Sequence, residues 1–222
     1  MIDNGDSGMS MSKYKKRILI IDDEAVFREA LTRALMSCGF EGISENNPSN
    51  GIMRLKKESF DLLLLDIMMD PFDGWDTLAH IRSLSTGVDI PVIMASAKNL
   101  DVNEIIRYGE FVAGFVSKPF VDSEFCEAIS DFFSWYDPLI KNAKAAQLQG
   151  VPLDMCNRWI RLTRQIKAIN QMMEVVSPRC IPNESSTEEE CMTQRRSQIH
   201  LMIRDKNKER DELRILYPVF SL

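Results

Sequence analysis

The chain has 222 residues, of which 45% are hydrophobic and 27% charged, and its formal net charge is −6 at pH 7. This composition is that of a globular protein of one or two domains, and no apolar stretch approaches the roughly 20 residues of a membrane-spanning helix. The first residues are polar and predict no secretory signal. The five scattered cysteines argue against a disulfide framework or a structural zinc site. We therefore expect a cytoplasmic protein without a membrane partner.

Charge divides the chain into two parts. The first 137 residues carry 23 acidic and 13 basic side chains, whereas the remainder carries 10 and 14. An acidic front part and a mildly basic back part indicate two regions with different partners. We expect a disordered leader over residues 1–16, rich in Gly, Ser, Asp and Lys, one domain over 17–137 and a helical region over 138–222.

From Arg17 onward, short apolar runs alternate with segments of helical spacing. The runs are rich in Ile, Leu and Val and predict buried strands. The predicted strands cover residues 17–23, 40–46, 61–66, 89–96 and 112–117. The predicted helices between and after them cover residues 24–38, 48–57, 74–84, 100–108 and 122–135. This alternation predicts a doubly wound α/β sheet of parallel strands, because right-handed crossovers leave few other arrangements.

After Pro138 the strand signals stop, and helices are predicted over 138–149, 153–176 and 192–216. In the second of these, apolar residues from Trp159 onward alternate steps of three and four over about three heptads. This stripe indicates that the region pairs with itself or with a second copy of the chain. A helical hairpin, doubled by a second copy into a four-helix bundle, would bury it. We therefore expect a homodimer with an all-α dimerisation region.

Polar residues stand where four of the predicted strands end. Asp22 and Asp23 end the first strand and Asp66 the third, while Ser96 and Lys118 end the fourth and fifth. The carboxyl ends of parallel strands meet at one edge of the sheet, where doubly wound folds bind ligands. One such residue usually caps a turn or a helix, but five at one edge favour a chemical site.

Three carboxylates at one edge repel one another unless a cation joins them. A hard divalent ion held by carboxylate oxygens and waters fits Mg²⁺. Asp66 would then attack a phosphoryl group and form an acyl phosphate, with Lys118 as a point charge and Ser96 as a hydroxyl donor.

Four stretches, "ILIIDDE", "LLLLDIMMDPFDGW", "PVIMASAK" and "FVSKPF", resemble in order and separation the motifs of two-component response-regulator receiver domains. The resemblance covers residues 17–135 and implies a flavodoxin-like (βα)5 fold. It also implies a sensor histidine kinase as the phosphodonor. It makes Asp66 the phosphoacceptor and Lys118 the phosphate-binding lysine. The implied Mg²⁺ ligands are Asp22, Asp23, Asp66 and the main-chain carbonyl of Met68.

The same resemblance implies a switch, and the sequence departs from the family pattern twice, at Asp70 and in a segment between Gly109 and Phe115 that is about two residues longer than usual. Ser96 matches the switch hydroxyl and Phe115 the switch aromatic, and the bond Lys118–Pro119 is expected to be cis. Asp70 stands where the family usually has Pro, with Pro71 one place later, so we expect a reshaped loop. Asp70 is then a loop cap or, less simply, an outer-sphere group of the metal.

These patterns predict a phospho-accepting response regulator with a non-enzymatic helical output, because residues 138–222 carry no cyclase, phosphodiesterase or ATPase motif. One alternative is a DNA- or RNA-binding transcriptional regulator using a basic helix. Its basic residues are Arg158, Arg161, Arg164 and Lys167. Such a row is more often a solvated helix face. A third possibility is a phosphorelay transfer protein using His200, which lacks the sequence context of a phosphotransfer histidine.

Overall fold

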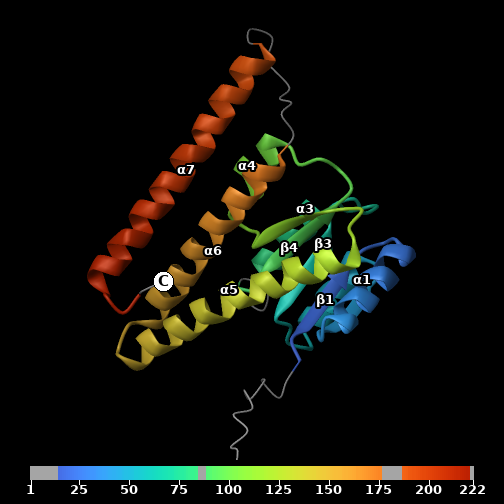
Figure 1. The fold of residues 1–222 in the computed structure, drawn as a ribbon, viewed down its shortest axis with the longest axis horizontal. Helices are drawn as coiled ribbons and strands as arrows, with labels where there is room; N and C mark the ends of the chain where they lie inside the picture. Colours follow the sequence, from blue (N-terminus) through green and yellow to red (C-terminus); the bar gives the residue numbers. More distant parts are fainter. Residues whose placement is uncertain (1–14, 85–88, 177–186, 221–222) are drawn as a thin grey trace, which may run out of the picture.

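The computed structural model describes residues 15–84, 89–176 and 187–220 (Figure 1). Its five strands are β1 (Arg17–Ile21), β2 (Glu41–Glu45), β3 (Leu62–Asp66), β4 (Val92–Ser96) and β5 (Gly114–Ser117). Its helices are α1 (Ala25–Ser37), α2 (Pro48–Leu55), α3 (Gly74–Ser83), α4 (Val102–Tyr108), α5 (Asp122–Leu148), α6 (Leu153–Val175) and α7 (Glu188–Leu216). The leader predicted over 1–16 lies, except for its last two residues, outside the described residues.

The strands form one parallel sheet in the order β2-β1-β3-β4-β5. This order confirms the predicted doubly wound, flavodoxin-like fold. The register aligns Ile21 with Leu65 and Asp66 with Ala95, so the carboxyl ends of β1, β3 and β4 share one edge. All five residues of β3 are buried because helices cover both faces of the sheet.

Alternate residues of each central strand enter two separate cores. Ile18 and Ile20 of β1 pack with α1 and α5 on one face, whereas Leu19 and Ile21 pack with α2, α3 and α4 on the other. This period of two is that of a strand covered on both sides. The alternation determines toward which face of the sheet each side chain at a strand end points.

Helix α5 runs without a break from Asp122 to Leu148, with Pro138 inside it. The prediction of two helices separated near Pro138 is therefore wrong. Proline lacks the N–H that would bond to the carbonyl of Ser134, one turn earlier. Pro138 is exposed, and buried residues continue past it at helical spacing to Ala146, so packing outweighs the missing bond.

Helices α6 and α7 fold back onto the α/β unit (Figure 1). Gly150, at φ +94°, allows the turn from α5 into α6, and α6 then packs against α5, β5 and α4. Trp159 is 1% exposed and stacks on Phe220, with ring centroids 4.8 Å apart. The prediction that a second copy buries the Trp159 stripe is wrong, because one chain buries it. The buried stripe therefore no longer supports the expected homodimer, which stays a prediction.

Helices α6 and α7 are both anchored at the turn between α4 and β5. The Gln165 amide of α6 donates to the Glu110 carbonyl at 2.8 Å. Lys206 of α7 forms an ion pair with the Glu110 carboxylate at 2.7 Å and donates to the Gln165 side chain at 2.9 Å. One turn of the α/β unit thus holds both helices of the extension.

A disulfide joins Cys38, just after α1, to Cys126 in α5, and Cys191 is disulfide-bonded as well. The interpretation of the scattered cysteines as an argument against a disulfide framework is therefore wrong for Cys38 and Cys126. The number and spacing of the cysteines did not reveal this pair. Cys38 and Cys126 are 88 residues apart in the sequence, and only the packing of α1 on α5 brings them together.

Candidate phosphoacceptor site

Three carboxylates converge at the carboxyl edge of the sheet. Asp66 is the last residue of β3, and Asp22 and Asp23 follow β1, the neighbouring strand. One oxygen from each lies within 4.8 Å of the other two. Asp22 and Asp66 are buried, whereas Asp23 is exposed. The convergence expected from the strand ends is present.

Lys118 links two of these carboxylates. Its Nζ lies 2.6 Å from Oδ2 of Asp22 and 2.9 Å from Oδ1 of Asp66, and the three side chains are at most 2% exposed. The Lys118 ammonium also lies 4.6 Å from the centroid of the Phe27 ring. Lys118 follows β5, two strands away from β3, and its long side chain spans this distance. The expected cis bond to Pro119 is present.

The Asp66 carboxyl combines burial with an incomplete set of partners. Burial raises its pKa most strongly, the hydrogen bond and charge of Lys118 lower it, and the charge of Asp22 raises it again. Its Oδ2 atom is buried and has no hydrogen-bond partner among the residues described. A buried, unpartnered carboxylate oxygen is costly and marks a position for a cation or a phosphoryl group.

Gly74 permits the loop after Asp66 to close tightly. A Cβ at Gly74 would lie 2.1 Å from the Asp66 carbonyl oxygen and 2.8 Å from the Cα of Ile67. The Gly74 amide donates to the Ile67 carbonyl at 2.9 Å, and Asp73 caps α3 by accepting from the Asp76 amide at 2.8 Å. The motif "DGW" therefore fixes the backbone behind Asp66.

A family model of the response regulator receiver domain matches residues 18–130. The chain belongs to this family. The probable transcriptional regulator ycf27 of Pyropia yezoensis is 32% identical over 51% of this chain and 46% of its own length. The phosphate regulon transcriptional regulatory protein PhoB of Escherichia coli K12 is 27% identical over 63% of this chain and 60% of its own. The chain thus spans about half, or slightly more, of these relatives.

A solved structure supports the fold of this receiver independently. Chemotaxis protein CheY4 of Vibrio cholerae superposes with a TM-score of 0.50 at 18% identity, over 54% of this chain and 99% of that one. At this identity the likeness speaks for the fold alone. None of the helices described here has both the length and the hydropathy needed to cross a lipid bilayer.

Ser96 and Phe115, the two residues predicted to form a switch, lie on adjacent strands. Ser96 ends β4, is 1% exposed and accepts a hydrogen bond from the Lys98 amide at 3.0 Å. Phe115 of β5 is 5% exposed and packs in the core that includes Ile169 and Met172 of α6. The sequence did not predict that α6 covers Phe115.

The loop after Asp66 holds the two remaining positions that were predicted near the site. Met68 has an exposed side chain, and its role as a carbonyl ligand stays a prediction. Asp70 is exposed, its amide lies 3.4 Å from Oδ2 of Asp23, and the bond to Pro71 is cis. Asp70 is outside the carboxylate cluster, and an outer-sphere role stays untested.

The basic row of α6 is not one solvated face. Arg164 is buried, Arg158 pairs with Glu209 at 2.6 Å, and the exposed Lys167 lies 5.0 Å from the centroid of the Trp135 ring. Arg161 is exposed. The interpretation of four parallel basic side chains is therefore wrong for Arg164, since α6 turns that side toward the receiver.

Proposed function

We propose that the chain is a two-component response regulator that accepts a phosphoryl group from a sensor histidine kinase on Asp66. The observation that carries the proposal is the buried, unpartnered Oδ2 of Asp66 beside Lys118 and two further carboxylates. The proposal includes a cytoplasmic location and a helical output without enzymatic activity of its own.

In the proposed reaction a carboxylate oxygen of Asp66 attacks the phosphorus of the phosphohistidine. The new O–P bond forms as the bond from phosphorus to the histidine nitrogen breaks, so the electron pair leaves with the donor. Lys118 would hold one phosphoryl oxygen by charge, and Ser96 would donate its hydroxyl to another.

The acid cluster fits Mg²⁺, because Asp22, Asp23 and Asp66 each offer an oxygen ligand within 4.8 Å of the other two, and Lys118 pairs with only two of these carboxylates. These carboxylates and the Met68 carbonyl would hold the ion. When bound, Mg²⁺ would neutralise charge on the transferring phosphoryl oxygens.

The phosphorylated site would act on the helical region through β4 and β5. Movement of Ser96 toward the phosphoryl group would alter the packing of Phe115, which shares a core with Ile169 and Met172 of α6. Looser packing of α6 would expose apolar surface of the helix to a second copy of the chain or to another partner.

Acetyl phosphate with Mg²⁺ tests the proposal. Intact-protein mass spectrometry should show one added phosphoryl group on the wild type and none on Asp66→Asn, and EDTA should prevent labelling. Asp70→Asn, which removes a nearby exposed acid outside the cluster, should label as the wild type does. Equal labelling of the wild type and Asp66→Asn would contradict the central assignment.

A DNA- or RNA-binding regulator is the second candidate, because the similar proteins of Pyropia yezoensis and Escherichia coli are named as transcriptional regulators. The exposed basic residues of α6 are Arg161 and Lys167. Retention on nucleic acid that falls with salt and is lost on charge reversal of both would favour this function. His200 is exposed on α7, and its phosphotransfer role remains a prediction that no observation favours.

A further inference from the structure

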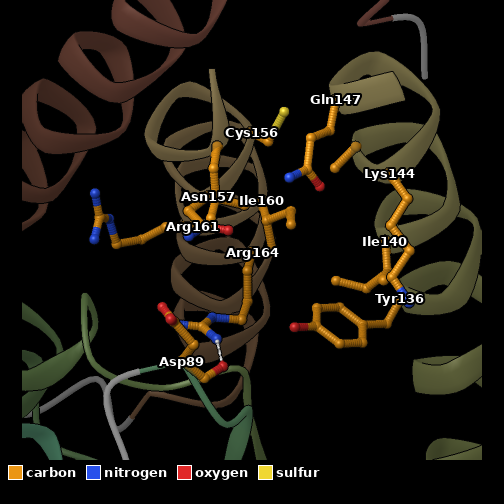
Figure 2. A pocket seen from close by; sticks show the side chains of 12 residues that line it. Asp89, Tyr136, Ile140, Lys144, Gln147, Cys156, Asn157, Ile160, Arg161 and Arg164 are labelled. Carbon is orange, nitrogen blue, oxygen red and sulfur yellow. Dashed lines mark hydrogen bonds between the residues drawn. The ribbon is translucent and has the colours of Figure 1, made fainter. Parts of the chain in front are cut away.

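A cavity lies between α5 and α6, away from the phosphoacceptor site. Its volume is about 250 Å³, and its walls include Ile140 and Ala143 of α5 and Leu153 and Ile160 of α6. Figure 2 shows side chains of the two helices facing each other across it, with Asp89 at its lower end. The walls are mainly apolar, and the cavity is smaller than a site for a drug-sized ligand.

One charged side chain is buried at the polar end of this cavity. Arg164 is 3% exposed, and its Nη1 atom donates to the Asp89 carbonyl at 2.9 Å. Its Nε atom is buried and has no hydrogen-bond partner in the part of the chain described. In Figure 2 the Tyr136 hydroxyl points from α5 toward the Arg164 guanidinium. The cavity therefore contains a donor without an acceptor.

The charges around Arg164 leave its guanidinium poorly compensated. Burial lowers the pKa of Arg164, while the neighbouring Tyr136 and Asp89 favour its charged form. No ion pair within 4.0 Å holds Arg164 among the described residues. Lys144 also lines the cavity, so Asp89 is outnumbered by basic groups. A buried cation without a bonded anion is unfavourable, and a bound anion would complete the site.

The chemistry of the site selects one class of anion. A guanidinium presents two parallel N–H donors that match the two oxygens of a carboxylate. One negative charge matches one buried arginine, and the apolar walls favour a short apolar or aromatic body over bulk water. We propose that this cavity binds a small monocarboxylate, with the Nε edge of Arg164 as its main partner and Tyr136 as a second hydrogen-bond donor.

Benzoate titrated into the full-length protein tests the proposal by calorimetry and by ¹H–¹⁵N NMR. We expect one saturable site with a Kd of about 1 mM or tighter. Benzamide, which keeps the ring without the charge, and inorganic phosphate, which keeps charge without an apolar body, should each bind at least about tenfold more weakly. Phosphate binding as strong as that of benzoate would overturn the carboxylate assignment.

Three variants distinguish this cavity from non-specific binding. Arg164→Gln should weaken benzoate binding at least about tenfold, whereas Lys167→Gln should change it less than about twofold, because Lys167 is exposed on α6 and does not line the cavity. Ala143→Phe should block binding by filling the cavity while Arg164 remains. Circular dichroism checks that each variant is folded.

Two outcomes overturn the proposal. One is the absence of saturable benzoate binding to the wild type up to about 10 mM, which would leave Arg164 as an anchor for the Asp89 loop only. The other is binding that survives both Arg164→Gln and Ala143→Phe. Asp66→Asn should bind benzoate as the wild type does, so the result is independent of the phosphorylation proposal.

Discussion

Lys118 is the residue on which the balance of charge at the site depends. It lies between the buried carboxylates of Asp22 and Asp66 and bonds to both. Removing one partner of a buried ion pair costs more than the pair contributes, because the remaining charges stay out of water. The lysine therefore stabilises the fold and the site together.

Lys118→Met should lower the free energy of unfolding by about 3–5 kcal/mol at neutral pH. Burial already raises the pKa of Asp66 in the folded protein, and the charge of Lys118 lowers it. Loss of the ammonium therefore raises this folded-state pKa further above the unfolded value. A carboxyl with a raised folded pKa opposes folding above that pKa, so the deficit relative to wild type should shrink as pH falls. Urea unfolding at several pH values measures this. A deficit that is constant with pH would contradict the charge argument.

Gly74→Ala tests the tight backbone behind Asp66. The new Cβ would collide with the Asp66 carbonyl oxygen at 2.1 Å, so the loop must move. We expect a loss of about 1–3 kcal/mol in stability and slower labelling by acetyl phosphate. Gly42→Ala is the matched control, because its Cβ would meet nothing closer than 3.2 Å. Equal effects of the two substitutions would contradict the steric role of Gly74.

At the scale of elements, the strands and their end residues could be predicted, whereas the partners of the long helices could not. The run Leu62–Leu65 is apolar throughout because both faces of β3 are covered, and Asp66 therefore stands at an edge. The stripe from Trp159 indicates a buried helix face, but its spacing does not say whether the covering surface belongs to the same chain. The disulfide arises from packing of α1 on α5 and the cavity from packing of α6 on α5, and neither contact could be predicted from the sequence.

The length of α5 gives a prediction of its own. Pro138 interrupts one helical hydrogen bond at an exposed position, while Tyr136 and Leu139 beside it are buried. Pro138→Ala restores the missing N–H donor. The stability gained by the helix exceeds the stability lost through the greater conformational entropy of the unfolded chain. We expect the free energy of unfolding to rise by about 1–2 kcal/mol. Thermal unfolding measures it, and a lower Tm would contradict the continuous helix.

At the scale of the whole molecule, helices α6 and α7 cover the side of the receiver that carries Phe115. Helix α6 packs on β5 and α4, and α7 packs on α6 and α4 (Figure 1). The monomer thereby buries apolar surface of β5 that would otherwise face water or a partner. Any response of Phe115 to phosphorylation must act against this covering.

Hydrogen exchange measured by mass spectrometry tests this coupling. After treatment with acetyl phosphate and Mg²⁺, the wild type should exchange faster in α6, because altered packing of Phe115 weakens its contact with the helix. Helix α2, which packs on β1 and β2, should be unchanged, and Asp66→Asn should show no difference in either helix. Unchanged exchange in α6 of a fully phosphorylated sample would contradict the proposed route.

The contacts at Glu110 determine how α6 and α7 would separate from the receiver. Its carbonyl accepts from Gln165 of α6, its carboxylate pairs with Lys206 of α7, and Lys206 in turn bonds to Gln165. Because the three groups bond to one another, breaking one contact weakens the other two. The two helices should consequently leave the receiver in a single cooperative event, as one unit with one opening free energy, and not one after the other.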